Sequence, residues 1–129
     1  MKNLEQIRAL HAHRFWNPKN QTGKQRLADV QGEQGGDVVR GLSSLIIANG
    51  LLATLAFAKE KKKGYQTFME EIGRFLSSQG DDGRHLFSQQ INTLDDFIDR
   101  LTNNDSLTLQ RAADESLAYL AYLKRFRTI

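Results

Sequence analysis

Three closely spaced aspartates are the residues of this sequence whose types and spacing best suit chemistry. Asp95 and Asp99 are four residues apart, so on a helix they share a face, with Asp96 beside them. Such carboxylates could bind a metal ion or act as an acid–base pair. The apolar residues between 94 and 101, however, are spaced to form the buried side of the same helix, which turns the aspartates toward solvent. We therefore expect a solvated face or a partner-facing patch.

The histidines and the known catalytic motifs do not indicate an active site either. His11 and His13 are two residues apart on an expected helix, so they point to different faces, and we expect both, like His85, at the surface. The sequence has no cysteine and lacks the phosphate-loop, nucleophile-elbow and zinc-protease motifs. These observations predict no catalytic residue, no metal and no cofactor. We expect that the chain is not an enzyme.

Lysines and arginines form the remaining group of candidate functional residues. One cluster follows an uncharged stretch at 41–58, and another lies at 124–127. The helix dipole stabilises cations at a helix C-terminus by about 0.3–1 kcal/mol each, which explains both clusters without a binding role. If they converge with the cations between 24 and 40, they form a surface that binds nucleic-acid phosphates. Both interpretations stay open. The candidate nucleic-acid-binding residues are Lys24, Arg26, Arg40, Lys59, Lys61, Lys62, Lys63, Lys124, Arg125 and Arg127.

Charge is distributed unevenly along the chain, although the net charge is only +3. Residues 1–64 hold 11 Lys and Arg against 5 Asp and Glu, whereas residues 65–115 hold 4 against 10. This asymmetry indicates either a polyanion-binding face with a separate partner face, or a chance distribution of surface charge. We expect Glu71 and Glu115 near the first turns of their helices, where acids favour the dipole and need no further role.

The periodicity of apolar residues predicts an all-α fold. The 129 residues, with a single proline, suit one domain over 1–129. We expect a bundle of five or six helices around a central hydrophobic helix. Residues 17–36 are expected to form a long polar loop, with room for a short helix near 25–30, and Asp37 to cap the next helix. The predicted helices cover 3–15, 41–58, 65–79, 86–101 (as one or two helices) and 106–126.

The uncharged stretch at 41–58 has two interpretations. Its 18 residues just reach the length of a transmembrane helix. Serine, threonine, asparagine and glycine dilute its hydrophobicity, and no second such stretch accompanies it, so we expect the buried helix of a small bundle and no membrane contact. The Asn49-Gly50 pair is expected to kink or split this helix, or to let a neighbouring helix approach closely.

Two segments resemble a known family. "SSLIIANGLLATLAFAKEKK" has a hydrophobic helix, then Asn-Gly-Leu, then an apolar stretch that ends in an aromatic residue and lysines. "ADESLAYLAYLKRF" ends a last helix in aromatic-Leu-Lys-Arg, and Arg8-Ala9 lies in an early helix. With these features, the chain resembles the small all-helical subunit of the Cmr complex, the type III-B CRISPR RNA-guided effector.

The resemblance implies a non-catalytic structural subunit for antiviral defence in the cytoplasm. Copies of such a subunit stack along the guide–target RNA and contribute a basic phosphate-binding surface, whereas other subunits cleave. The implied partners are other Cmr complex subunits, copies of the chain itself, and guide RNA–target RNA, with no membrane and no small-molecule substrate. Asn49 and Gly50 are assigned to helix packing.

Two other functions remain to be weighed. One is a helical protein–protein adaptor that uses the acidic helices at 65–101 and binds no nucleic acid. The other is an enzyme subunit whose composite active site includes Asp95 or Asp99. The adaptor predicts no salt-dependent RNA binding, which separates it from an RNA-binding subunit. The enzyme subunit predicts that mutation of Asp95 or Asp99 abolishes an activity while assembly persists.

Overall fold

The computed structural model describes residues 2–17, 33–61 and 63–127. Within these ranges it contains six helices and no strand, which confirms the predicted all-α fold. The candidates Lys24, Arg26 and Lys62, and the expected short helix near 25–30, lie outside the described residues. The helices are α1 (Leu4–Trp16), α3 (Glu33–Asn49), α4 (Leu51–Glu60), α5 (Lys63–Leu76), α6 (Leu94–Thr102) and α7 (Ser106–Arg125).

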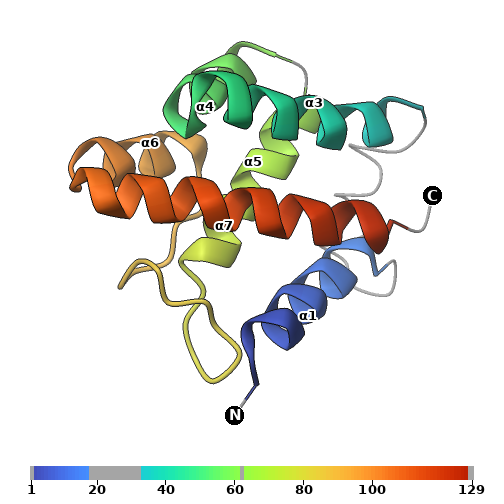
Figure 1. Ribbon diagram of the computed structural model, residues 1–129, viewed down its shortest axis with the longest axis vertical. Helices are drawn as coiled ribbons and strands as arrows, with labels where there is room; N and C mark the ends of the chain where they lie inside the picture. Colours follow the sequence, from blue (N-terminus) through green and yellow to red (C-terminus); the bar gives the residue numbers. More distant parts are fainter. Residues whose placement is uncertain (1, 18–32, 62, 128–129) are drawn as a thin grey trace.

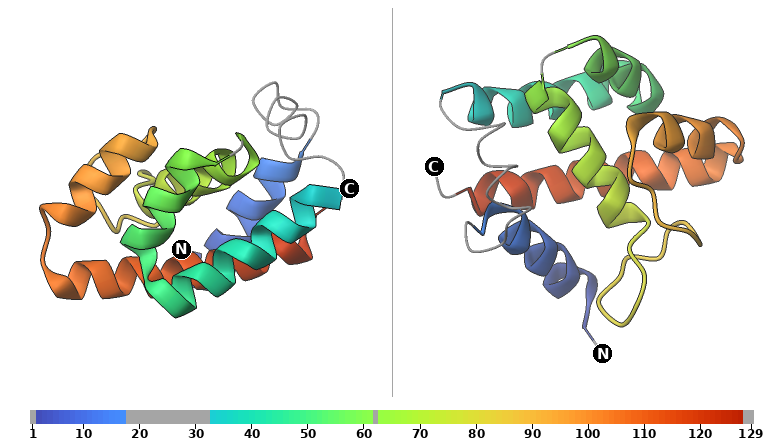
Figure 2. Two further views of the ribbon diagram at one scale, coloured as in Figure 1. Left: turned by 90° about the horizontal axis from the view of Figure 1, so that it is seen from above. Right: turned by 180° about the vertical axis from the view of Figure 1, so that it is seen from behind.

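The longest helix, α7, runs across the whole molecule, and the other helices pack around it (Figure 1). Helix α3 lies beside α7 in the opposite direction, and α1 contacts α7 near its C-terminal end (Figure 1). Viewed from behind, α5 crosses α7 in the middle of the molecule and contacts α3, α4 and α6 as well (Figure 2). One hydrophobic core joins all six helices, and its largest buried side chains are Trp16, Tyr119, Phe15, Phe68, Phe75 and Phe97.

The uncharged stretch forms two helices, so the expected split at Asn49-Gly50 is confirmed. Gly50 has φ +91°, a conformation that side chains with a Cβ rarely adopt, and it turns the chain between α3 and α4. Its carbonyl accepts hydrogen bonds from both the amide and the hydroxyl of Thr54, at 3.2 and 2.8 Å. Only one side of each helix is buried, and Ile47 on the outer side of α3 is 74% exposed.

Helix α3 begins earlier than the sequence indicates. We expected Asp37 as its N-cap and 17–36 as loop, but the helical backbone already starts at Glu33. The physical reason is the burial of Val38 and Val39. If the helix began at Asp37, the backbone amides of these two buried residues would have no helical partner, whereas an earlier start provides carbonyls four residues before them. The buried turn therefore extends the helix toward the N-terminus despite its glycines.

The connection between α5 and α6 is not helical, which corrects two predictions. Helix α5 ends at Leu76 and not near residue 79, and of the expected helical region at 86–101 only α6 is helical. Polar side chains replace the helical hydrogen bonds: the Ser77 hydroxyl accepts from the Ile91 amide at 2.7 Å, and the Gln79 side chain donates to the Phe87 carbonyl at 2.8 Å. The connection is thus fixed to the core although it has no regular structure.

A buried carboxylate fastens this connection and α1 to α7. Arg8 donates two hydrogen bonds to Glu115, from Nε at 2.5 Å and from Nη2 at 2.8 Å. Arg84, from the connection, lies with its Nε 3.1 Å from Oε1 of the same carboxylate, the oxygen that also accepts from Arg8 Nη2. Glu115 is only 4% exposed and lies in the middle of α7, so its expected place near a first turn was wrong.

The pKa of the Glu115 carboxyl lies below its ordinary value. Burial by itself would raise this pKa, but the hydrogen bond from Arg8 and the charges of Arg84 and Arg8 outweigh it. The unfolded chain therefore binds more protons at acidic pH than the folded chain does. The stabilisation is complete above the ordinary glutamate pKa of about 4.3 and is lost as the pH falls through the lowered pKa of the folded state.

The glycine at the α3–α4 turn gives a first prediction. Changing Gly50→Ala should lower the free energy of unfolding by about 1–3 kcal/mol, because an L side chain is strained at its backbone angles. The matched control is Gly41→Ala in α3, where a new Cβ meets no atom within 4 Å and where alanine should stabilise by about 0.5–1 kcal/mol. Urea unfolding of the two variants measures both, and equal stabilities would contradict the geometry of the turn.

The Glu115 carboxylate gives a second prediction. Changing Glu115→Gln should cost up to about 3 kcal/mol at pH 7, because both arginines lose their partner. This cost should shrink as the pH falls below about 4, since the parent carboxylate then becomes protonated too. The control is Asp114→Asn, an exposed neighbour that accepts a hydrogen bond from Gln110 of its own helix. Chemical unfolding at several pH values checks this, and the same pH dependence for both variants would be the contrary result.

Candidate nucleic-acid interface

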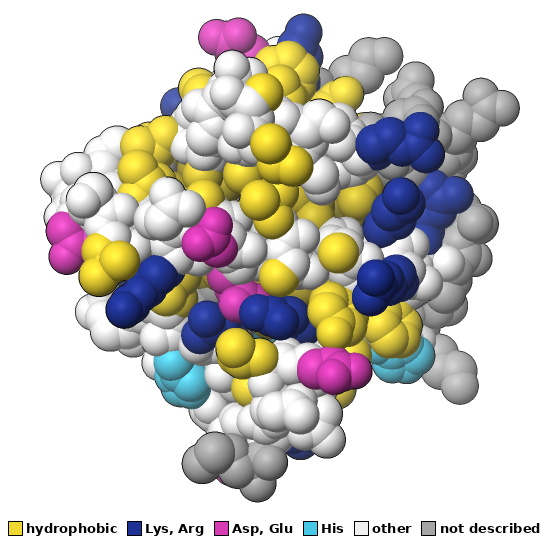
Figure 3. Space-filling model, in the orientation of Figure 1, with side chains coloured by type: hydrophobic (Ala, Val, Ile, Leu, Met, Phe, Trp, Pro, Cys, Tyr) yellow, Lys and Arg dark blue, Asp and Glu magenta, His cyan; other side chains and the backbone are white. Residues whose placement is uncertain are grey.

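Four exposed cations gather where α3 lies beside the C-terminal end of α7. Arg40 comes from α3, and Lys124, Arg125 and Arg127 come from the end of α7, and all four side chains are exposed. Figure 3 shows Lys and Arg side chains gathered at this end of the molecule. In the described part of the chain, none of the four makes an ion pair or a side-chain hydrogen bond. We call this group the α3–α7 basic patch.

The core fixes the position of this patch. Leu123 is fully buried, and its carbonyl accepts a hydrogen bond from the indole nitrogen of the buried Trp16 at 2.8 Å. The last turn of α7 is therefore tied to the last turn of α1. Lys124 and Arg125 follow directly and face outward, where the negative end of the helix dipole also favours them.

The lysines after the uncharged stretch lie elsewhere. Helix α4 ends at the top of the view in Figure 1, away from the end of α7. Lys59 lies 2.6 Å from a carboxylate oxygen of Asp95, and the hydrogen bond to this carboxylate raises the pKa of Lys59. Lys61 lies over the ring of Phe57, 5.1 Å from its centroid, and the side chain of Lys63 is not among those described. The structure thus divides those predicted basic residues whose side chains it describes into two separate groups.

The acidic and histidine candidates have mostly structural partners. Asp95 pairs with Lys59, and Asp96 lies 3.5 Å from Arg100 on its own helix. The Nε2 atom of His11 lies 2.9 Å from the backbone carbonyl oxygen of Asp82. Among the described residues, no group of three or more His, Asp or Glu side chains is placed to hold a metal ion.

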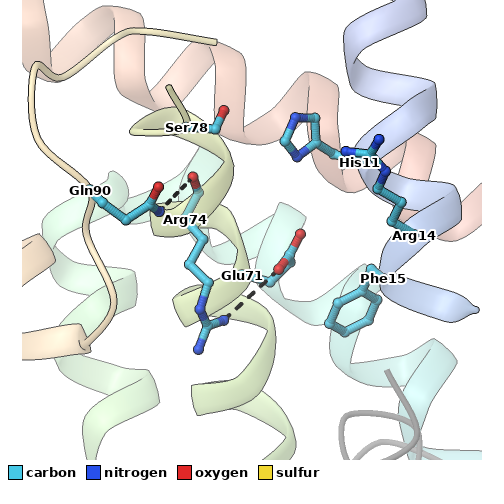
Figure 4. Close-up of a pocket in the computed structure, with 7 residues that line it drawn as sticks. All are labelled: His11, Arg14, Phe15, Glu71, Arg74, Ser78 and Gln90. Atoms are coloured by element: carbon cyan, nitrogen blue, oxygen red, sulfur yellow. Dashed lines mark hydrogen bonds and ion pairs between the residues drawn. The ribbon is translucent and has the colours of Figure 1, made fainter. Parts of the chain in front are cut away.

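A small pocket lies between α1, α5 and the α5–α6 connection (Figure 4). Its volume is about 240 Å³, which is below the range of most small-molecule sites. The side chains around it carry both signs of charge, whereas the α3–α7 basic patch is defined by cations alone. The lining residues are His11, Arg14, Phe15, Glu71, Arg74, Ser78 and Gln90.

Glu71 in this pocket was missed by the sequence analysis, which placed it near a first turn. Its carboxylate is buried, accepts a hydrogen bond from the Tyr119 hydroxyl at 2.6 Å and lies 3.9 Å from Arg74 (Figure 4). A usable signal exists in the sequence: Glu71 lies three residues after Phe68 and four before Phe75, so it shares their buried face. An acid on an apolar helix face requires a partner.

The length and polarity of the described helices test the transmembrane interpretation of the uncharged stretch at 41–58. None of them is both long and apolar enough to cross a membrane, and the uncharged stretch is interrupted at Gly50.

Comparison with known proteins identifies the family. The family model described as CRISPR-associated protein (Cas_Cmr5) matches residues 9–129, which run from within α1 to the last residue. No curated protein and no solved structure matches the chain. The match agrees with the resemblance carried by the Asn-Gly-Leu segment and the Leu-Lys-Arg ending. The chain therefore belongs to the Cas_Cmr5 family, the small CRISPR-associated subunits of the type III-B complex.

Proposed function

We propose that the chain is a non-catalytic structural subunit of its type III-B complex, and that it lays the α3–α7 basic patch against the phosphates of the guide–target RNA. The observation that carries this proposal is the set of four exposed cations, from two helices, without ion-pair partners in the described residues. Cations with internal partners already have their charge compensated, whereas these four are available to an external polyanion.

Backbone binding is the mode of recognition that such a surface supports. Lysine and arginine neutralise phosphates and release condensed counterions, which gives affinity that falls steeply with salt. Contacts to phosphates position a protein on RNA but do not read its sequence. A structural subunit that must accept any target sequence requires this kind of contact. The Lys59–Lys61 group would serve as a second, weaker contact, because its two described members already interact with Asp95 and Phe57.

Stacking of copies is the second part of the proposal. The basic patch lies at the C-terminal end of α7, whereas Asp99 and Asp105 lie near the N-terminal end of the same helix. Copies arranged head to tail would bring these opposite charges together. This contact is heterologous, so it continues from copy to copy along an RNA of given length.

The adaptor alternative receives less support from the structure. It needs an acidic face that is free to contact a partner, but Asp95 and Asp96 of α6 pair with Lys59 and Arg100. Exposed pairs of this kind compensate charge within the chain and leave a weak field outside it.

Affinity capture of the tagged chain from its native cells tests the proposal. We expect short RNAs that carry a repeat-derived segment, together with the large subunits of the CRISPR complex. Sequencing of the bound RNA and mass spectrometry of the proteins measure the two components separately. Recovery of the protein subunits without RNA, even at low salt, would overturn the RNA-binding role and favour the adaptor.

Neutralising the basic patch gives a third prediction. The triple variant Lys124→Gln, Arg125→Gln and Arg127→Gln should bind single-stranded RNA about 10- to 100-fold more weakly at low salt. The slope of log affinity against log salt should decrease by about 2, since each phosphate contributes about 0.7. Fluorescence anisotropy of labelled RNAs measures both quantities.

The matched control neutralises the two described lysines near the end of α4, with Lys59→Gln and Lys61→Gln. We expect a smaller loss, because these lysines already have partners. Both losses should be the same for RNAs of different sequence. A larger effect of the control, or a loss confined to one sequence, would contradict backbone binding by the α3–α7 basic patch.

A further inference from the structure

An aromatic pair, the half-buried Tyr122 and the exposed Phe126, lies at the C-terminal end of α7 beside the cations of the α3–α7 basic patch. The rings of Tyr122 and Phe126 are nearly parallel, with an angle of 12° and centroids 6.3 Å apart. The ring of His13, from α1, meets Phe126 edge-on with a centroid distance of 6.4 Å. Figure 3 shows hydrophobic and histidine side chains next to Lys and Arg at this end of the molecule.

The core accounts for Tyr122 in part, since this half-buried ring packs against it, but it does not account for Phe126. Tyr119, one turn earlier in α7, is fully buried and stacks on Phe75 with centroids 4.0 Å apart. Phe126, in contrast, is 37% exposed, and it is the one aromatic residue among the large hydrophobic side chains exposed in the described chain. The exposed face of this ring is therefore available for a contact outside the chain.

The pair is held on a rigid support. The Phe126 amide donates to the Tyr122 carbonyl at 2.9 Å, which ends α7. One turn before, Trp16 and Leu123 join α1 to α7 through the indole hydrogen bond and their burial. The two helices that carry the three rings are therefore fixed relative to each other, and no ordering of this support is needed on binding.

Cations neighbour the aromatic pair along the chain. Lys124 and Arg125 lie between Tyr122 and Phe126 in sequence, and Arg127 follows. Stacking rings beside backbone-binding cations is the arrangement by which proteins bind unpaired nucleotides. We propose that Tyr122, Phe126 and His13 form a platform on which one unpaired RNA base stacks, while the neighbouring cations bind its phosphates. This inference rests on the proposed RNA binding and adds that the RNA is unpaired at this contact.

A nucleobase fits these residues better than an acidic peptide does. Carboxylates would neutralise the cations but leave the apolar ring faces in water. A nucleotide presents a flat aromatic base and an anionic phosphate together, so it covers both. Base pairs within a duplex are stacked on each other, and the platform therefore selects a single-stranded or extruded nucleotide.

Replacing the exposed ring tests the inference. The variant Phe126→Leu keeps an apolar side chain but removes the ring, and it should bind a single-stranded RNA about 5- to 100-fold more weakly at low salt. Against an oligomer of equal length and charge without bases, parent and variant should bind alike. The control Leu107→Ala removes a side chain that is 57% exposed at the other end of α7, and it should leave both affinities unchanged.

A fluorescent variant gives an independent readout. Phe126→Trp places a second tryptophan on the platform, whereas the natural Trp16 is 1% exposed and supplies a constant background. We expect quenching by single-stranded RNA, and little quenching by the base-free oligomer or by duplex RNA. A Leu107→Trp variant should show no quenching with any of them.

The outcomes separate this inference from the proposed function. Equal binding of base-bearing and base-free oligomers by the parent would overturn the platform and leave phosphate binding intact. No binding of either at low salt would overturn both. Quenching of the Phe126→Trp variant by a polyglutamate peptide as strong as that by RNA would assign the surface to an acidic protein partner and overturn the platform.

Discussion

The carboxylate of Glu115, buried between two arginines, is the interaction on which the arrangement of this protein depends. Arg8 comes from α1 and Arg84 from the α5–α6 connection, so one side chain of α7 joins segments that are far apart in sequence. A buried carboxylate without these partners would be strongly unfavourable, which leaves few alternative placements for either segment. Helix α1 and the connection consequently have defined positions although both carry many polar residues.

The position of α1 in turn decides what the end of α7 can do. With α1 in place, Trp16 binds the Leu123 carbonyl, and the last turn of α7 is held on the core instead of fraying. Cations and aromatic rings in a frayed terminus would lose conformational entropy on binding RNA. Here Lys124, Arg125 and Phe126 stand on a fixed support, which is what the proposed contacts with phosphates and a base require.

In the uncharged stretch and in the basic clusters, the sequence pattern alone did not decide burial or charge pairing. Eighteen uncharged residues suggested a helix buried on most sides, but the turn at Gly50 divides them, and each half buries one side only. Similarly, the lysines around the end of α4 and the cations around the end of α7 looked equivalent in sequence. The tertiary structure places Asp95 beside Lys59, whereas among the residues that it describes no acid pairs with Lys124 or Arg125.

The sequence by itself determined the all-α fold, the extent of α7 to within one residue and, through two short segments, the Cas_Cmr5 family, and it offered a break at Asn49-Gly50 as one of several outcomes. These properties are local, because apolar periodicity, capping and glycine conformation depend on neighbours along the chain. Only the tertiary structure decided which partners the carboxylates of Glu71 and Glu115 have, that the residues before α6 are irregular, and that the described cations form two groups. Burial and ion pairing depend on residues 36 to 107 positions away, and periodicity along the chain carries no information about such distant partners.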